Sequence, residues 1–511
     1  IFFLSSARNV CPTPSELRSV PCQNNRDPNL CHCAPDQAFI IVIRTYVIAR
    51  RTKHSSSMKN EATLQFVQLH REDDVNRLAF LGDKNPDVDM PWALAQISGW
   101  QTARRKLPSW AACDGLEYPP HLNMEQCSSE PTAIYKASLA SRLVGADAAE
   151  HGLLVDLTGG FGVDFSWMAR AFAHAVYVER NETLCPIAQH NFQQLGLGHV
   201  EIHVGDGVAY LQTMPLVPER TTGCSHPLTL IYLDPARRDT YGRKVFGMED
   251  CTPDVVELCD TLLLRADIVV IKLSPMLDWH EAVRKLKNVS EVHVVSVSNE
   301  CKELLLVLTR EKRPLRVFCV NDGQTFTYCV SGASRPLEGA LRASDDALRS
   351  SDDALHAPEI VSGRPADASR VMPEEEFHNV SLPTHSPDAT PSVLLVPNSS
   401  IMKAGCFREI AVAFGVSQIS SDAHLYLSNG AVPHFPGRQF RILRITSMNK
   451  RDLRQAFQGV SQANIAVRHF PLTADALRRR LKLKDGGSLY VFATTIGKDH
   501  RLILTEKLVA P

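Results

Sequence analysis

The chain has 511 residues, a formal net charge of −1 and a hydrophobic fraction of 44%. This length is too great for one ordinary domain, and the apolar fraction is sufficient for several cores. No run of 18 apolar residues is present, so no membrane span is expected. The 14 cysteines include no CxxC pair, so no metal is expected, and their scatter is typical of a reducing cytoplasm.

The first 57 residues differ in kind from the rest of the chain. They begin with Ile1 and mix Pro, Ser and Asn with four cysteines, without helical or strand periodicity. Met58 is followed at once by sequence with helical spacing. We interpret residues 1–57 as translated sequence upstream of a start at Met58, with a disordered leader as the alternative.

Residues 58–144 are predicted to form a helical amino-terminal domain. Apolar residues recur with helical spacing over Asn60–Leu81 and Met90–Arg105, and prolines mark a loop over Leu107–His121. A further helix is expected to run through Leu143. Ser128 or Ser129 can cap that helix, and Glu130 lies in its first turn.

The centre of the chain is the segment Leu153–Gly162, with the sequence LLVDLTGGFG. It reads as a short apolar strand that ends in Asp156, followed by a glycine-rich turn and a helix over Val163–Phe172. Glycines in such a turn allow a tight bend and a close approach of the backbone to a ligand. The segment therefore predicts the first strand, loop and helix of a doubly wound nucleotide-binding fold.

Four more apolar strands are predicted after this turn, and each ends in polar or turn residues. The strands are expected at Ala175–Val178, Val200–Val204, Leu228–Leu233 and Ile268–Leu273. The residues that follow them are Glu179, Gly205-Asp206-Gly207, Asp234-Pro235, and Ser274-Pro275 directly after Lys272-Leu273. Because the carboxyl ends of parallel strands share one edge of a sheet, we expect these residues at one crevice.

The order DxxGGxG, acid, GDG, DP resembles the class I S-adenosylmethionine-dependent methyltransferases over roughly 145–312. The dehydrogenase pattern GxGxxG is not met. The resemblance implies that the loop faces the methionine part of the cofactor, that Glu179 binds the ribose and that Asp206 binds the adenine. The cofactor residues it implies are Asp156, Thr158, Gly159, Gly160, Gly162, Glu179 and Asp206, with Gln126 and Ser128 from the stretch before the preceding helix. That helix is either a capped helix with only a structural role or one that closes over the methionine end of the cofactor.

Four residues at the predicted crevice are candidates for catalysis: Asp234, Pro235, Arg237 and Lys272. The carboxylate of Asp234 could accept a hydrogen bond from an amino or ring N–H and so raise the nucleophilicity of the nitrogen. In amino-methylating nucleic-acid enzymes, the acid is followed by two prolines and an aromatic residue. Here Pro235 matches, but Ala236 and Arg237 replace the others. The alternative is a structural Asp-Pro turn, and Lys272 is expected either to face the substrate or to pair with an acid.

Basic residues after Asp234 are candidates for contact with the substrate. Arg237 belongs to the proposed catalytic set, and Arg238 suits phosphate or a base edge. The loop Thr240–Met248 carries Arg243 and Lys244 and is interpreted as a mobile basic flap.

Residues 313–432 are predicted to form a small β-rich, ferredoxin-like domain that is interrupted by a disordered acidic insertion. After the strands Val292–Ser298 and Leu304–Thr309 close the methyltransferase sheet, Leu315–Val320 and Thr325–Val330 are expected to begin the new domain. The insertion covers 337–390. Between 341 and 390 it has ten acids and four Lys/Arg.

Residues 433–511 are predicted to form a basic α+β domain of alternating strands and helices. Between 437 and 484 there are twelve Lys/Arg and two acids, an excess that favours a nucleic-acid partner. The candidate RNA contacts there are Arg478, Arg479, Arg480 and Lys482.

This last segment and the stretch 91–137 resemble a bacterial methyltransferase family with a THUMP-like carboxyl-terminal domain. THUMP domains bind RNA, so the resemblance implies an RNA substrate, tRNA or rRNA. The resulting prediction is an α/β protein with a doubly wound Rossmann-like sheet, a helical front domain and carboxyl-terminal α+β domains. We expect it to methylate a base nitrogen in structured RNA. The alternatives are an RNA-binding protein without catalysis and a methyltransferase for small molecules or proteins.

Overall fold

The computed structural model describes six stretches of the chain: 60–80, 85–145, 148–218, 227–236, 248–330 and 393–508. The predicted leader 1–57, the acidic insertion 337–390 and loop residues 240–247 lie outside them. Of the helices in these stretches, none is long and apolar enough to cross a membrane. Nor do the described residues bring together three or more His, Cys, Asp or Glu side chains that could hold a metal ion.

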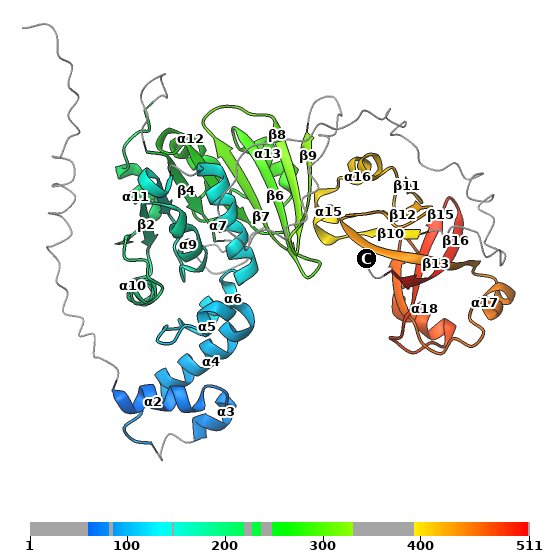
Figure 1. The fold of residues 1–511 in the computed structure, drawn as a ribbon, viewed down its shortest axis with the longest axis horizontal. Coiled ribbons are helices and arrows are strands. Elements are labelled where there is room, and N and C mark those ends of the chain that lie inside the picture. Colours follow the sequence, from blue (N-terminus) through cyan, green and yellow to red (C-terminus); the bar gives the residue numbers. More distant parts are fainter. Residues whose placement is uncertain are drawn as a thin grey trace, which may run out of the picture. The chain divides into compact units, whose positions relative to one another are not determined.

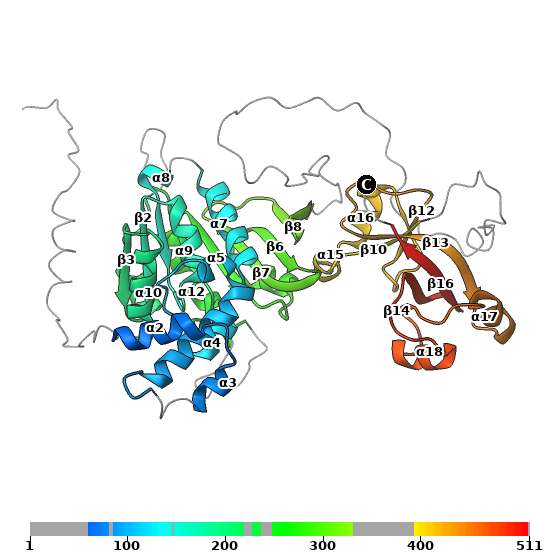
Figure 2. The ribbon, with the colours of Figure 1, turned by 60° about the horizontal axis from the view of Figure 1, so that its bottom comes forward.

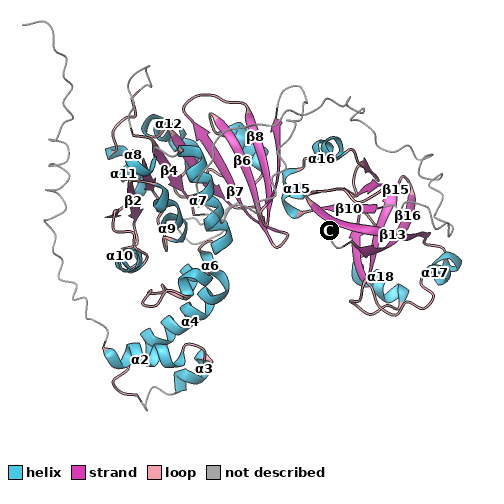
Figure 3. Cartoon of the chain, viewed as in Figure 1, coloured by secondary structure: helices cyan, strands magenta, loops and turns pink. Residues whose placement is uncertain are grey.

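The first sheet has nine strands in the order β3-β2-β1-β4-β5-β7-β6-β8-β9 (Figures 1 and 3). Strands β1 to β5 are mutually parallel, and β7 pairs antiparallel with both β5 and β6. This is the predicted doubly wound sheet with its closing strand pair. The strands are β1 (Leu153–Asp156), β2 (His174–Glu179), β3 (Val200–Val204), β4 (Thr229–Leu233), β5 (Ile268–Leu273), β6 (Val289–Val297), β7 (Glu300–Thr309), β8 (Leu315–Asn321) and β9 (Gln324–Val330).

Helices cover both faces of this sheet. Successive residues of its buried strands point to opposite faces, and both sets are apolar. On one face, Leu154 and Val270 pack with α7, α9 and α10. On the other face, Val155 and Ile271 pack with α11, α12 and α13. The bounds of these helices are α7 (Glu130–Val144), α8 (Ala148–His151), α9 (Val163–Met168), the 3-10 helix η2 (Ala169–Ala171), α10 (Leu184–Gln194), α11 (Gly207–Thr213), α12 (Val255–Arg265) and α13 (Trp279–Lys285).

The assignment of the segment from residue 313 to a separate β-rich domain is wrong for its first two strands. Strand β8 pairs parallel with β6, and β9 pairs antiparallel with β8, so both extend the first sheet. The strand that joins them to this sheet, β6, lies before residue 313 in the sequence. The two strands are joined by a turn at Asn321-Asp322-Gly323, in which Asp322 and Gly323 have positive φ values.

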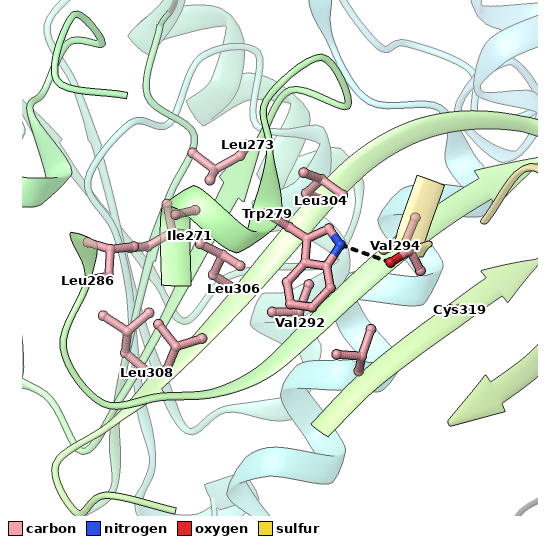
Figure 4. Packing of buried hydrophobic residues seen from close by; sticks show 14 of the residues in the cluster. Ile271, Leu273, Trp279, Leu286, Val292, Val294, Leu304, Leu306, Leu308 and Cys319 are labelled. Atoms are coloured by element: carbon pink, nitrogen blue, oxygen red, sulfur yellow. Dashed lines mark hydrogen bonds between the residues drawn. The ribbon is translucent and has the colours of Figure 1, made fainter. Parts of the chain in front are cut away.

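The core on this side of the sheet is shown in Figure 4. The indole of Trp279 in α13 lies among side chains of β6 and β7, including Val292 and Leu304. Its ring N–H donates a hydrogen bond of 3.3 Å to the carbonyl oxygen of Ala404. Because Ala404 belongs to the segment after residue 393, this core joins the two sheets of the protein.

The amino-terminal residues are helical, but the predicted helices are divided. Instead of one helix over Asn60–Leu81, there are two short helices, because Asp74 caps a new one by accepting from the backbone N–H of Asn76 at 2.8 Å. Two short helices also lie in and beside the predicted loop 107–121. The helices are α2 (Glu61–His70), α3 (Val75–Leu78), α4 (Met90–Lys106), α5 (Pro108–Ala111) and α6 (His121–Gln126).

Ser129 is the N-cap residue of α7, but its side chain makes no capping hydrogen bond. The first-turn acid Glu130 is buried and accepts hydrogen bonds from the backbone N–H and hydroxyl of Ser109, at 2.8 and 2.5 Å. This end of α7 is therefore fixed by α5.

The second sheet has seven strands in the order β11-β12-β10-β13-β16-β15-β14 (Figure 2). Two helices follow its first strand in the sequence, because Gly405 ends the first of them at a φ of 72°. The strands are β10 (Val393–Pro397), β11 (Ser417–Gln418), β12 (Tyr426–Ser428), β13 (Gly437–Ser447), β14 (Asn464–Arg468), β15 (Leu489–Ile496) and β16 (Asp499–Lys507). The helices are α15 (Ser399–Ala404), α16 (Phe407–Phe414), α17 (Lys450–Ala456) and α18 (Ala474–Leu481).

Candidate functional site

The glycine loop after β1 is shaped by close packing against β2. A Cβ on Gly159 would lie 2.2 Å from a ring carbon of Tyr177, and Gly160 and Gly162 have φ values of 57° and 81°. The hydroxyl of Tyr177 donates to the carbonyl oxygen of Gly160 at 2.5 Å. Glycine is thus required here for space at one position and for backbone conformation at two others.

Two predicted cofactor acids lie at the carboxyl ends of β2 and β3. Glu179 accepts hydrogen bonds of 2.7 Å from the backbone N–H groups of Gly160 and Asn181, which ties the glycine loop to β2. Asp206 caps α11 by accepting from the N–H groups of Val208 and Ala209, each at 2.9 Å. Both carboxylates line the same cavity as the loop.

Asp156 is buried at the end of β1, with only 2% of its surface exposed. Burial raises the pKa of its carboxyl to about 8, although the backbone N–H of Thr158 donates to it at 2.9 Å. The hydroxyl of Thr158 in turn accepts from the backbone N–H of Asp234 at 2.7 Å. Thr158 therefore joins the ends of β1 and β4.

Lys272 pairs with an acid and also lines the cavity. Its Nζ atom lies 2.6 Å from Oδ2 of Asp234 and 3.7 Å from Oδ2 of Asp164. Burial opposes the charged form of the amine, but Asp234 and Asp164 outweigh burial and hold the pKa of Lys272 above its ordinary value. Lys272 also donates to the hydroxyl of Ser128 at 3.2 Å, and that hydroxyl donates to Asp164 at 2.7 Å.

Three charged residues behind this pair were not singled out from the sequence: Lys136, Asp164 and Glu303. Nζ of Lys136 lies 2.5 Å from Oε1 of Glu303 and 3.2 Å from Oδ1 of Asp164. Tyr232 adds a hydrogen bond of 2.9 Å to Asp164. Burial acts against the ionised form of Asp164, but Lys136 and Lys272 hold its pKa below the ordinary value.

A signal for these residues is present in the sequence. Strand periodicity places Lys272 with Val270, and Glu303 with Leu305, on the face that packs against α7. Lys136 lies one helical turn before Ala140 on the buried side of α7. Charged residues on stripes that are otherwise apolar are rarely buried unless they are paired. Which of these charged residues pair with one another, however, can be known only from the folded structure.

The cavity has a volume of about 1370 Å³ and, with the exception of Gly205, brings together the predicted residues of the crevice that the structure describes. Gln126 and Ser128 line it beside the glycine loop, and Pro235 lines it beside Asp234. Arg237, Arg238, Arg243 and Lys244 lie outside the described residues.

The predicted RNA contacts on α18 do not line this cavity. The guanidinium of Arg478 is paired with Asp475 at 2.6 Å and with Asp485 at 2.7 Å, so its charge is compensated. Arg479, Arg480 and Lys482 are exposed. Of the four predicted RNA contacts, Arg479, Arg480 and Lys482 are therefore the ones whose charge is available to a nucleic acid.

Comparison with known proteins identifies the two carboxyl-terminal segments. A family model described as a ferredoxin-like domain matches residues 394–436, and one described as THUMP domain-like matches residues 437–507. The ferredoxin-like match begins at β10, after the two strands that extend the first sheet.

Two relatives and a solved structure are similar to most of the chain. Two uncharacterized S-adenosylmethionine-dependent methyltransferases, from two strains of Mycobacterium tuberculosis, are each 24% identical to it over 384 residues. These matches cover 73% of this chain and 83% of each relative. A crystal structure of a "putative methyltransferase" from Porphyromonas gingivalis is 28% identical, with a TM-score of 0.63, over 88% of this chain and 98% of its own. With its doubly wound sheet, its strand-end cavity and these similarities, the chain is an S-adenosylmethionine-dependent methyltransferase with carboxyl-terminal ferredoxin-like and THUMP-like domains.

Proposed function

We propose that this methyltransferase modifies structured RNA, tRNA or rRNA, in the cavity at the ends of β1, β2, β4 and β5. The observation that carries the proposal is the convergence of the glycine loop, Glu179, Asp206 and Asp234 on one cavity, in a chain that also has a basic THUMP-like segment. S-adenosylmethionine supplies an electrophilic methyl group when it is bound.

The residues of the cavity fit this cofactor. Gly159 and Gly160 line the cavity without side chains, so a ligand can lie close to the backbone there. Carboxylates of Asp156, Glu179 and Asp206 line the cavity and suit a ligand with a sulfonium cation, an amino group and ribose hydroxyls. We assign Glu179 to the ribose, Asp206 to the adenine side, and Asp156, Thr158 and the glycines to the methionine side, with Gln126 and Ser128 nearby.

Asp234 is the residue that we assign to the acceptor. Its side chain is 40% exposed toward the cavity, and Pro235 fixes the turn that follows it. The sequence motif favours a base nitrogen as the acceptor atom. From the sequence, we keep Arg237 in the proposed catalytic set and assign Arg238, Arg243 and Lys244 to contact with the substrate.

The test is transfer of a labelled methyl group from S-adenosylmethionine to RNA extracted from cells that lack the gene. We expect the intact protein to label this RNA and Asp234→Ala to lose transfer by about 100-fold or more while cofactor affinity is kept. Asp260→Asn is a matched control, because Asp260 is exposed and pairs only with Lys287 among the contacts described. Labelling of protein or small molecules in an extract, with none of RNA, would contradict the proposal.

A further inference from the structure

Five charged side chains of alternating sign form a continuous chain at the inner wall of the cavity. In order they are Asp234, Lys272, Asp164, Lys136 and Glu303, and successive members are 2.6, 3.7, 3.2 and 2.5 Å apart. Side-chain exposure falls from 40% at Asp234 to 13% at Lys272 and 0% at Lys136. The chain is therefore open to the cavity mainly at Asp234 and Lys272.

Such an arrangement is a costly way to stabilise a fold. Removing several charges from water carries a desolvation penalty that ion pairing only partly offsets, and apolar residues of similar volume often do as well. Because these charges come from β4, β5, β7, α7 and α9 and converge beside the proposed acceptor site, a role in the reaction explains them better than stability.

We infer that the acceptor atom is a hydroxyl oxygen of RNA, the ribose 2′-hydroxyl, and that Asp234 and Lys272 act on it together. This inference rests on the proposed RNA function and replaces the base nitrogen that the sequence motif favours. Asp234 receives the hydroxyl proton, and the ammonium of Lys272 stabilises the oxygen as it loses that proton.

The charge of Lys272 distinguishes the two kinds of acceptor. A nitrogen that attacks a methyl group gains positive charge before it loses its proton, so an ammonium at the acceptor raises its barrier. An oxygen that loses its proton gains negative charge, and a fixed cation in a partly dry cavity stabilises that charge. Asp164 and Asp234 keep Lys272 charged and directed at the open end of the chain.

Although Asp234-Pro235 match the amino-methylating motif, the departure from that motif after Pro235 agrees with an acceptor on the sugar. An amino nitrogen on a base must be brought to the methyl group by turning the base into the site, where an aromatic residue stacks on it. Here Ala236 and Arg237 stand where a second proline and that aromatic residue would be. A ribose hydroxyl lies on the backbone and needs no such stacking partner.

The atoms balance in a single displacement. The hydroxyl oxygen forms a bond to the methyl carbon while the bond from that carbon to sulfur breaks, and the sulfonium becomes a neutral thioether. The hydroxyl proton passes to the carboxylate of Asp234 and from there to water. The step needs no oxidant or reductant.

The position of the methyl group tests the inference directly. RNA labelled by the intact protein is hydrolysed with alkali, which cleaves only where a free 2′-hydroxyl can attack the neighbouring phosphate. We expect the label in alkali-stable dinucleotides. Label in ordinary mononucleotides would place the methyl group on a base and overturn the inference while the RNA function stands. No label in RNA would overturn both.

A variant of Lys272 tests its part in the step. We expect Lys272→Met to lower kcat by about 10²–10³-fold, with cofactor affinity measured by calorimetry changed little. Lys287→Met is the control, because Lys287 is 66% exposed and pairs with Asp260 away from the cavity. Melting temperatures show whether each variant is folded. An unchanged or raised kcat in folded Lys272→Met would contradict the inference, since a nitrogen acceptor gains from loss of the cation.

Discussion

At the scale of single residues, Asp156 joins the stability of the fold to the binding of the cofactor. Its carboxyl is buried, and its pKa is raised from an ordinary value of 3.8 to about 8. Between these two pH values the folded protein holds a proton that the unfolded chain has released. The contribution of Asp156 to the free energy of unfolding is therefore greatest at low pH and is lost as the pH rises to about 8.

We predict that Asp156→Asn stabilises the ligand-free protein at pH 8, because the amide carries no charge to bury. The variant should melt several degrees above the intact protein at pH 8 and less far above it at pH 5. Scanning calorimetry at both pH values measures this difference. An equal change at the two pH values would show that titration of Asp156 is not involved.

The same carboxyl should couple cofactor binding to proton release. A cationic ligand favours ionised Asp156, so binding at pH 7 should release up to one proton and become tighter toward pH 8. Titration calorimetry in two buffers of different ionisation enthalpy counts that proton, and Asp156→Asn should abolish its release. Asp260→Asn is the matched control, and proton release that persists in Asp156→Asn would assign it to another group.

At the scale of elements, the strands at the site could be predicted because each has a complete local signal. Strands β1, β3 and β5 have their predicted bounds, whereas β2 is longer than predicted by one residue at each end and β4 is shorter by one residue. Pairing is not local, and for that reason β8 and β9 were placed in the wrong sheet. The buried positions of Lys136 and Glu303 follow from periodicity, but their meeting depends on how α7 packs on β7.

The contact between α11 and Leu157, the residue that follows β1, leads to a further prediction. A Cβ on Gly207 would lie 2.0 Å from the carbonyl oxygen of Leu157, so Gly207→Ala must displace α11 and Asp206, its cap. We expect a loss of about 1–3 kcal/mol in the free energy of unfolding and weaker cofactor binding. Gly198→Ala is the control, because nothing lies within 4 Å of its Cβ position. Denaturant unfolding measures the free energy of unfolding of both variants. Equal values would contradict a steric clash between the new Cβ at position 207 and Leu157.

At the scale of the whole molecule, catalysis and RNA binding are assigned to different segments of the chain. The cavity belongs to the first sheet, and the excess of ten positive charges between 437 and 484 belongs to the second. A partner bound through phosphates releases counterions, so its affinity falls with salt in proportion to the number of contacts. Loss of these contacts should therefore weaken RNA binding and spare the cofactor site.

We predict that neutralising Arg479 and Arg480 to Gln flattens the log–log salt dependence of RNA affinity by roughly one to two, at about 0.7–0.9 per phosphate contact. Arg478 is left in place, since Asp475 and Asp485 already compensate its charge. A control with Lys285→Gln and Lys287→Gln removes the same net charge from residues that pair with acids near α13. Filter binding across a salt series compares the three proteins. If the control flattens the slope as much as the arginine variant, total charge governs binding; if neither changes it, α18 is an ordinary solvated helix.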